Sequence, residues 1–417
     1  MKKYFPIQTG TSCRSKWSWS TLYLNLGETA SCHRASRSPI PEDFDSFHNT
    51  DRKLKDRETM LQGKWPGNGC EHCEIFERSG TVSDRMFQNT VPNIYPEELD
   101  SDPTRIKVDP VVLELQFSNL CNLGCVYCGP ACSSFIQQEA IRFGGNLSEP
   151  HRFVTVNTHR EYSEKFFNWF DQHGHKLKRL QLIGGEPLLQ PEVQRLIDVI
   201  IHRRFPDLEL NIISNFSVPR SRTFPILDKL ADAVIQKRLH RVDINTSIDC
   251  WGASQIYARH GIDLELFEMN MQHLLSLGVF RVGIMSTVNS LSISAMPELM
   301  IQWQRWNQKQ RVHWYLNLIQ PSGRTIFTPE IFEYKNFQSS FKQILNSLSD
   351  DADDWDNQSL RQSLSSLNDL FKIRCHNNID GQLKLLNFFR QNDHRRNLES
   401  EKVFPWIYDI FRQNHVV

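Results

Sequence analysis

The sequence lacks both an imbalance of charge and a long apolar run. Its 417 residues include 48 lysines and arginines and 48 aspartates and glutamates. A chain of this kind has no field of one sign that would attract nucleic acid or an anionic membrane surface. No apolar stretch approaches the ~20 residues that span a bilayer, and the opening segment MKKYFPIQTGTSCRSKW has no apolar core of a secretory signal. We therefore expect no membrane, no nucleic-acid partner and a cytoplasmic location.

Cysteine, in contrast, is abundant, with ten residues in the chain. Without a secretory signal, disulfides are disfavoured and clustered thiols indicate metal ligands. Seven of the ten fall into two groups before residue 129. The first group is Cys13, Cys32, Cys70 and Cys73, and the second is Cys121, Cys125 and Cys128.

The composition of the chain changes along its length. Residues 1–106 are polar and loop-rich, with one predicted hairpin in STLYLNLGETASCHR, where LYLNL alternates and GET provides the turn. The segment VPNIYPEELDSDPTRIKVDP is rich in Pro and Asp and predicts a linker. Residues 326–417 predict a helical C-terminal extension, interrupted by a solvated acidic loop at DDADDWD.

Residues 107–325 alternate short apolar runs with helical stretches. In one predicted helix, Phe267, Met271 and Leu274 form an apolar stripe that Gly278 can end. The predicted strands are 111–117, 179–183, 208–213, 241–249, 282–288 and 312–319. Six strands alternating with helices predict an α/β fold with a parallel sheet, open or barrel-like.

The segment SNLCNLGCVYCGP, residues 118–130, directly follows the first predicted strand. Ligands of parallel α/β sheets bind at the carboxyl ends of the strands. Three thiolates suit a cubane iron–sulfur cluster, in which each cysteine binds one iron and the fourth iron stays open. An open coordination position is what a catalytic metal needs. A zinc site with a distant fourth ligand is the alternative.

The CxxxCxxC spacing, with Tyr127 before the third cysteine, resembles the signature of the radical S-adenosylmethionine (SAM) enzymes. Further segments follow in the order that this family has. They are LIGGEPLL with Gly184, Gly185, Glu186 and Pro187, IISN with Ser214 and Asn215, NTSIDCWG with Ser247 and Asp249, and YARHG with Arg259. The resemblance covers roughly residues 110–320. It implies a partial (β/α)6 barrel, in agreement with the six predicted strands.

The resemblance also implies cofactors and roles for these residues. SAM and a [4Fe–4S] cluster would be bound, and a reduced cluster would cleave SAM to a 5′-deoxyadenosyl radical that abstracts a substrate hydrogen. Glu186 would accept a hydrogen bond from the methionine ammonium, Ser214 and Asn215 would contact the ribose, and Arg259 would bind the carboxylate. The other residues expected along SAM are Tyr127, Gly184, Gly185, Pro187, Ser247 and Asp249.

Each of these segments also has a plainer interpretation when it is taken alone. GGEP could be a tight turn, and Ser214 with Asn215 could cap a helix. Arg259 could be a surface arginine. The occurrence of all segments in strand order favours the enzyme.

The four N-terminal cysteines and the hairpin resemble the twitch or SPASM module, in which a hairpin and short loops bind an auxiliary [4Fe–4S] cluster. In most such enzymes the module follows the barrel, whereas here it precedes the barrel. Four cysteines would saturate the cluster, which implies electron transfer or structural support. A zinc site with four cysteine ligands is the alternative.

The substrate is less defined than the chemistry. A peptide or protein side chain is expected, with a small metabolite or nucleotide as the alternative, and a flavodoxin or ferredoxin is the expected electron donor. Cys250, after the fourth predicted strand, is interpreted as a small core residue or as a donor that quenches a substrate radical. The alternative hypothesis from a different class of function is a non-catalytic protein that binds iron–sulfur or zinc and keeps the fold as a scaffold.

Overall fold

The computed structural model describes residues 3–78, 80, 82–143, 156–319, 325–349 and 354–417. Two units interleave along the chain. Unit 1 comprises Met1–Leu120, Arg152–Ile213 and Asp232–Val242, and unit 2 comprises Cys121–His151, Ser214–Ala231 and Asp243–Val417. Both units contain segments of the region predicted to form the sheet. The division into residues 1–106, 107–325 and 326–417 stays a prediction.

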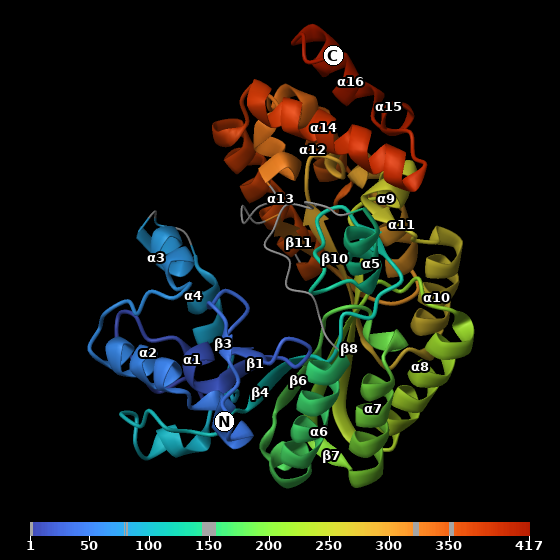
Figure 1. Cartoon of the computed structure of the whole chain (residues 1–417). Coiled ribbons are helices and arrows are strands. Elements are labelled where there is room, and N and C mark those ends of the chain that lie inside the picture. The colour runs from blue at the N-terminus through green and yellow to red at the C-terminus, as the bar shows by residue number, and fades with distance from the viewer. Residues whose placement is uncertain (1–2, 79, 81, 144–155, 320–324, 350–353) are drawn as a thin grey trace. The chain divides into compact units, whose positions relative to one another are not determined.

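In unit 1, the first three predicted strands are β4 (Val112–Gln116), β6 (Arg179–Leu182) and β7 (Phe205–Ser214). They pair in parallel, β4 with β6 and β6 with β7. Strand β4 is buried along its whole length, as the apolar run predicts. Helices α6 (Val156–His173) and α7 (Pro191–Arg203) lie side by side beside these strands (Figure 1), joined by an ion pair of 2.7 Å between Arg195 and Glu164.

The N-terminal hairpin belongs to the same sheet. Strands β1 (Trp19–Tyr23) and β2 (Glu28–Ala30) pair antiparallel, and β3 (Ser38–Pro39) follows β2. Strand β1 also pairs in parallel with β4, from Trp19 opposite Val112 to Tyr23 opposite Gln116. The hairpin is therefore confirmed, but its turn lies at residues 24–27, and Glu28 and Thr29 of the predicted turn belong to β2. The parallel pairing of β1 with β4 is a feature that the sequence did not indicate.

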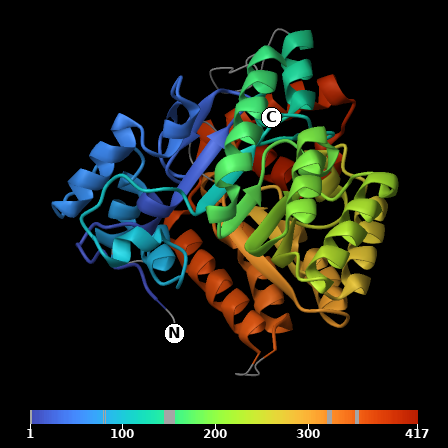
Figure 2. The same cartoon turned by 90° about the horizontal axis from the view of Figure 1, so that it is seen from below.

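The N-terminal region is more helical than predicted. It contains α1 (Arg14–Ser18), α2 (Asp51–Leu61), α3 (Glu71–Arg78) and α4 (Asp84–Asn89), drawn in blue in Figure 2. Helix α2 begins after Thr50, whose side chain accepts a hydrogen bond from the Lys53 amide. Its buried residues are Lys53, Asp56, Arg57 and Met60. Because most of this inner face is charged, hydrophobic periodicity does not reveal the helix.

The predicted linker at residues 91–110 is anchored in a core of unit 1. Tyr95, Leu99 and Val108 are buried there in one apolar cluster with Phe5 and Trp17. The Pro and Asp content of this segment indicates turns, but it does not show that the apolar residues between them are buried.

In unit 2, residues 243–247 of strand β8 (Leu239–Ser247) pair in parallel with β10 (Arg281–Val288), and β10 pairs in parallel with β11 (Val312–Leu318). The helices of this region are α8 (Arg220–Ile235), α10 (Leu264–Leu277) and α11 (Met296–Asn307). Helix α10 ends at Gly278, which has a φ of 66° and a left-handed conformation, as predicted. All six predicted strands are present, which confirms the α/β fold with parallel strands.

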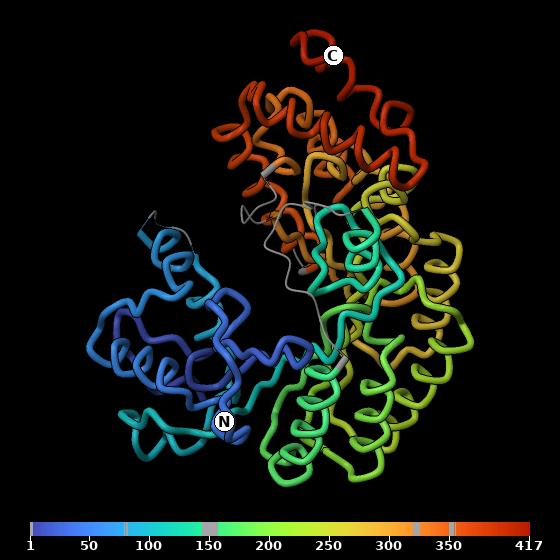
Figure 3. The backbone as a smooth tube through the Cα atoms, viewed as in Figure 1, coloured from blue at the N-terminus to red at the C-terminus, as the bar shows by residue number. Residues whose placement is uncertain are grey.

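The C-terminal extension is helical, as predicted. It contains α12 (Lys335–Ser347), α13 (Trp355–Arg374), α14 (Ile379–Arg396), α15 (Ser400–Val403) and α16 (Pro405–Gln413), which Figure 3 follows in orange and red. Residues 350–353 of the predicted acidic loop lie outside the described residues. No helix in the described parts of the chain is both long enough and apolar enough to cross a membrane.

Candidate functional site

The three-cysteine loop of unit 2 is held by a short antiparallel ribbon. Strand β5 (Gly124–Cys125) pairs with β9 (Arg259–His260), so that Cys125 lies opposite Arg259. The Val126 amide donates to the carbonyl of Ala258 at 2.8 Å, which extends the ribbon by one more contact. Two predicted site residues that are far apart in the sequence therefore stand on neighbouring strands.

Gly124 permits a close approach within this loop. A Cβ atom at this position would lie 2.7 Å from the ring of Phe135 and 3.2 Å from Nη2 of Arg396. Phe135 belongs to α5 (Ser134–Phe143), the helix that follows the loop. Only glycine therefore allows the ring and the guanidinium to lie against the backbone directly before Cys125.

Cys121 receives hydrogen bonds at its sulfur. The Leu123 amide lies 3.5 Å from Sγ, and Nδ2 of Asn215 lies 3.9 Å from the same atom. Donors of this kind stabilise a thiolate more than a thiol and surround the sulfurs of iron–sulfur ligands. The surroundings of Cys121 are therefore those of a ligand sulfur.

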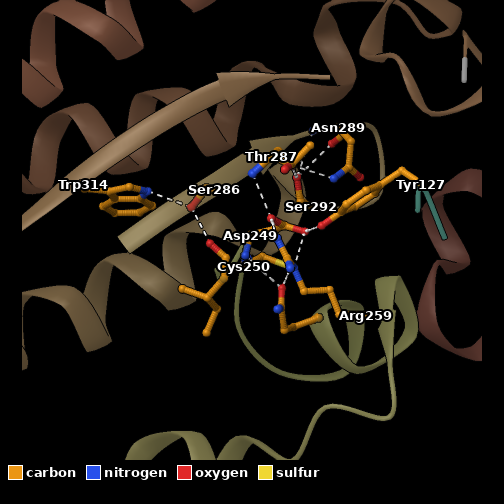
Figure 4. A network of polar contacts seen from close by, with 11 residues as sticks. Tyr127, Asp249, Cys250, Arg259, Ser286, Thr287, Asn289, Ser292 and Trp314 are labelled. Atoms are coloured by element: carbon orange, nitrogen blue, oxygen red, sulfur yellow. Dashed lines mark hydrogen bonds and ion pairs between the residues drawn. The ribbon is translucent and has the colours of Figure 1, made fainter. Parts of the chain in front are cut away.

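Asp249 organises the polar network in Figure 4. Its side chain is fully buried, and its carboxylate accepts hydrogen bonds from Arg259 Nε at 3.1 Å, Arg259 Nη2 at 2.9 Å and the Thr287 amide at 2.8 Å. It also accepts the phenol proton of Tyr127. Burial alone lowers the pKa of Arg259, but the Asp249 carboxylate outweighs it, and the pKa lies well above its ordinary value. The Arg259 guanidinium is therefore held in its charged form.

This network changes the interpretation of Arg259. The residue is only 7% exposed, which excludes a surface arginine. Two of its nitrogen atoms donate to Asp249, a residue that the sequence placed independently along SAM. The structure thus brings Tyr127, Asp249 and Arg259 together as one unit, while the binding of a carboxylate by Arg259 stays a prediction.

The GGEP turn of unit 1 packs against the residues before the cysteine loop. Gly184 and Gly185 have φ values of 76° and 55°, and Cβ atoms there would overlap with Gln116 and with the carbonyl oxygen of Leu120. The Glu186 amide donates to that same oxygen at 2.7 Å. Both glycines are therefore required by conformation and by close approach.

Glu186 is fully buried within this turn. Its Oε1 atom accepts a hydrogen bond of 3.0 Å from the Leu188 amide and so caps the short 3-10 helix Pro187–Leu189. Gln190 was missed by the sequence analysis. Its Nε2 donates to the Gly184 carbonyl at 2.7 Å and its Oε1 accepts from the Ser118 amide at 3.2 Å. The side-chain amide of Gln190 therefore joins the GGEP turn to the segment that starts at Ser118. No sequence signal distinguishes this residue from a surface glutamine.

The segment after β7 also contacts the cysteine loop. Ser214 Oγ accepts from the Phe216 amide at 2.9 Å, and Asn215 Oδ1 accepts from the Ser217 amide at 2.9 Å. Nδ2 of Asn215 donates to Oδ1 of Asn122 at 2.9 Å. Both side chains therefore shape a turn ahead of α8, which begins at Arg220, rather than cap that helix, and Asn215 in addition reaches the loop. Their contact with a ribose stays a prediction.

Ser247 and Cys250 flank the end of β8. Ser247 is half-buried and lies opposite Met285 of β10. Cys250 is fully buried, and its thiol lies 3.6 Å from Oε1 of Gln255. Burial raises the pKa of Cys250 well above its ordinary value. These contacts agree with a small core residue, and the role of hydrogen donor stays a prediction.

The four N-terminal cysteines come from three segments of unit 1, and electrostatic effects connect them. Cys13 precedes α1, Cys32 follows β2, Cys70 directly precedes α3, and Cys73 lies in the first turn of α3. The pKa of Cys13 is raised to about 11 and that of Cys70 to about 12. Burial is the largest cause of both increases, and the nearby Cys32 contributes to both. Cys32 also raises the pKa of Cys73, after burial. Cys32 therefore lies within electrostatic range of the other three thiols.

A backbone contact closes this cysteine group. The Ser36 amide donates to the Asn68 carbonyl at 3.0 Å. Gly69 has a φ of 92°, and a Cβ atom there would overlap with the carbonyl oxygen of Arg34. The loop before Cys70 therefore lies directly against the segment after Cys32.

Buried cations surround the same cysteines. Lys16 Nζ pairs with Asp56 at 2.6 Å, while Lys53 Nζ donates to Ser20 Oγ, Thr29 Oγ1 and the Phe47 carbonyl at 2.8–2.9 Å. Burial, followed by repulsion from Arg57 and Lys16, holds the pKa of Lys53 well below its ordinary value. Cys32 raises the pKa of both Lys16 and Lys53 and so opposes the effect of burial on these two lysines. In the part of the chain that the structure describes, the direct partners of Lys53 are neutral oxygen atoms, which stabilise a charged ammonium less than a carboxylate would.

Among the described residues, no three His, Cys, Asp or Glu side chains are arranged to hold a metal ion. The assignment of Cys121, Cys125 and Cys128 to one cluster stays a prediction. So does the assignment of Cys13, Cys32, Cys70 and Cys73 to a second metal site.

Neither the family models nor the curated proteins contain a match to this sequence. Similar solved structures include SuiB of Streptococcus suis bound to S-adenosylmethionine, with 11% identity and a TM-score of 0.38 over 77% of this chain and 67% of that chain. They also include anSMEcpe with bound AdoMet and the Kp18Cys peptide, with 12% identity and a TM-score of 0.37 over 67% of each chain. A third is TYW1 with a lysine–pyruvate adduct, with 14% identity and a TM-score of 0.30 over 59% of this chain and 75% of that chain. Similarity at this level is a distant likeness in the path of the chain and assigns neither family nor activity.

Proposed function

We propose that the chain is a radical SAM enzyme that binds a [4Fe–4S] cluster at Cys121, Cys125 and Cys128. The observation that carries the proposal is the β5–β9 ribbon. It places Cys125 opposite Arg259, and Arg259 in turn pairs with Asp249, which accepts the Tyr127 hydroxyl. Residues selected from three separate sequence segments therefore meet in one network. A chance match of short motifs gives no reason for such convergence.

The donor set suits an anionic iron–sulfur cluster. Burial raises the pKa of Cys125, whereas the positive charges of Arg259 and Arg396 lower it. Cys121 accepts hydrogen bonds from an amide and from Asn215. Positive charge and donors beside the sulfurs are among the features by which a protein stabilises such a cluster and sets its reduction potential.

When bound, the cluster would supply the electron that cleaves SAM to methionine and a 5′-deoxyadenosyl radical, which takes a hydrogen atom from the substrate. The residues of the chain would hold SAM for this step. The backbone amide of Glu186 donates a hydrogen bond to the Leu120 carbonyl, which fixes this residue, and its carboxylate would accept a hydrogen bond from the ammonium group. Arg259 would donate to the carboxylate from Nη1, because its Nε and Nη2 serve Asp249. Asp249 would thereby orient the guanidinium rather than bind SAM itself.

We further propose that Cys13, Cys32, Cys70 and Cys73 hold a second metal group, an auxiliary [4Fe–4S] cluster, with zinc as the alternative. The support comes from charge. Four thiolates around either group carry a net charge of about −2. Such a charge would offset the buried cations Lys16 and Lys53, both of which already respond to Cys32. Because both groups have the same charge, only metal analysis separates them.

For the substrate, we propose a peptide or protein side chain, which is what the twitch-like module suggests. A small metabolite or nucleotide is the alternative. A short precursor peptide encoded beside the gene would support the first, and its absence would favour the second. The electron donor is proposed to be a flavodoxin or ferredoxin.

Metal analysis and SAM cleavage test both sites. The anaerobically reconstituted chain should hold about eight irons, as two clusters of four. Alanine at Cys121, Cys125 and Cys128 should leave about four irons and abolish conversion of SAM to 5′-deoxyadenosine and methionine. Alanine at Cys132, four residues beyond Cys128, is the matched control and should change neither the iron content nor the cleavage of SAM.

Two results would contradict the proposals separately. Persistent cleavage of SAM by the triple variant would defeat the radical SAM assignment. Zinc together with about four irons in the wild type would defeat the auxiliary cluster and leave the catalytic one intact.

A further inference from the structure

We infer that the C-terminal extension acts on the cysteine loop through Arg396, which is a positioning residue for Cys125 and a charge beside it. Arg396 is the last residue of α14, and its Nη1 donates to the Gly124 carbonyl at 2.6 Å. Nε and Nη2 donate to the two oxygens of Glu139 in α5, at 2.8 and 2.9 Å. Only 4% of the Arg396 side chain and 7% of the Glu139 side chain are exposed. A buried, bidentate pair of this kind holds its groups in one geometry.

The contact is made at the residue before a predicted ligand. Gly124 and Cys125 form the whole of β5, so a bond to the Gly124 carbonyl fixes the backbone from which the Cys125 side chain extends. The guanidinium also lies over the ring of Phe135, 5.7 Å from its centroid. The lack of a side chain at Gly124 is what lets both groups approach.

A second contact of the same helix reaches the other strand of the ribbon. Asp393 Oδ1 accepts from the Tyr257 hydroxyl at 2.7 Å, and Asp393 Oδ2 accepts from the Ser400 amide at 2.8 Å. Tyr257 is fully buried, with its ring edge-on to Phe404 at 5.1 Å. Because Tyr257 lies two residues before Arg259, one turn of α14 and the segment after it secure both β5 and the approach to β9.

The charges of Arg396 and Glu139 give the inference a distinctive test. Reduction of a cluster at Cys125 adds one negative charge, which a nearby cation favours and a nearby anion opposes. Arg396→Gln leaves the carboxylate without its cation, so the reduction potential should become more negative. Glu139→Gln leaves the cation without its carboxylate, so the potential should become less negative. A purely mechanical tie predicts no such opposition, because either change would loosen the same loop.

The first measurement uses the metal-free, full-length chain and does not depend on the proposed function. Hydrogen exchange of the backbone amides of residues 121–128 should be about tenfold faster in Arg396→Gln, since a hydrogen bond of a charged group to the backbone is lost. Arg396→Lys should be intermediate, because an ammonium can reach only part of the set. Arg390→Gln is the matched control, since Arg390 is exposed on the same helix. Equal exchange in Arg396→Gln and Arg390→Gln would overturn the positioning role.

The second measurement is a redox titration of the reconstituted chain, followed by electron paramagnetic resonance. It rests on the proposed function, because it needs the cluster. Shifts of opposite sign in Arg396→Gln and Glu139→Gln, with Arg396→Lys near the wild type, are expected. Shifts of one sign in both would overturn the electrostatic role. A wild type without iron would refute the proposed function instead, and hydrogen exchange alone would then decide the inference.

Discussion

The two groups of cysteines differ in how their surrounding charges are balanced. In unit 2, Arg259 pairs with Asp249 and Arg396 pairs with Glu139, so each buried cation beside the loop has a carboxylate in contact. In unit 1, Lys16 has Asp56, but Lys53 contacts only neutral oxygen atoms. The cations beside the first group are therefore compensated by carboxylates, whereas beside the second group an anionic metal group would favour the charged form of Lys53, which burial and neighbouring cations disfavour.

The two groups also differ in how the chain assembles them. The cysteines of the loop lie within eight consecutive positions, and a ribbon holds that loop from one side. The N-terminal cysteines come from three segments, two of which meet where the backbone around Gly69 contacts Arg34. A local site depends on the groups that orient it, and a non-local site depends on the contacts that close it.

The largest expected effect comes from breaking a balanced pair. Asp249→Asn leaves the buried Arg259 without its counter-ion, and we expect the free energy of unfolding of the metal-free chain to fall by about 3–5 kcal/mol. Asp409→Asn is the control, because Asp409 pairs with Arg412 at 2.8 Å on the surface. That exposed pair is screened by solvent and should contribute little to stability. Urea denaturation measures both, and equal small losses would mean that the network in Figure 4 does not support the fold.

The next effect concerns the closure of the N-terminal group. Gly69→Ala places a methyl group against the Arg34 carbonyl, so the loop must move and Cys70 with it. We expect loss of the metal of this group and a destabilisation of about 1–3 kcal/mol beyond that of the control. The control is Gly63→Ala, because Gly63 also has a positive φ, of 71°, but a Cβ atom there meets nothing within 4 Å. Equal metal content in both variants would contradict the closure.

The sequence predicts the elements that follow a period and the sites that are local. The six parallel strands and the helix ending at Gly278 are apolar patterns of the kind that burial produces, and the structure contains them. Helix α2 was missed because its inner face carries Lys53, Asp56 and Arg57. Those side chains are buried by contacts with distant segments, which periodicity does not encode.

The hydrogen-bond partners of residues within the candidate site also could not be predicted from the sequence. Motif spacing selected Tyr127, Asp249 and Arg259 separately, but their mutual hydrogen bonds depend on tertiary structure. Arg396 lies in the predicted helical extension, and its contact with Gly124 joins residues that are far apart in the sequence of unit 2. Such pairings are visible only once the fold brings the segments together.

A smaller expected effect is a pH dependence of stability that arises from His48 in the polar core of unit 1. Burial, followed by repulsion from Arg57 and Lys53, holds the pKa of His48 well below its ordinary value. Below about pH 6.5 the unfolded chain therefore binds a proton that the folded chain does not, and stability falls by up to about 1.4 kcal/mol per pH unit. His48→Gln should remove this part of the pH dependence, while the exposed His394→Gln should not. Unfolding at pH 7, 6 and 5 measures the difference, and parallel curves for all three proteins would contradict it.

The smallest effect tests the excess charge itself. Lys53→Met removes a buried cation together with its three hydrogen bonds, two opposing changes that should alter the unfolding free energy of the metal-free chain by no more than about 1 kcal/mol. In the metal-loaded chain, the same change also removes a positive charge that faces the thiolate group. The stabilisation gained on loading should therefore be smaller by about 1–2 kcal/mol than in the wild type. Lys165→Met is the control, since Lys165 pairs with Glu161 on the surface. If loading stabilises the wild type and Lys53→Met equally, the buried cations do not compensate an anionic occupant, and the contrast between the two cysteine groups is one of assembly alone.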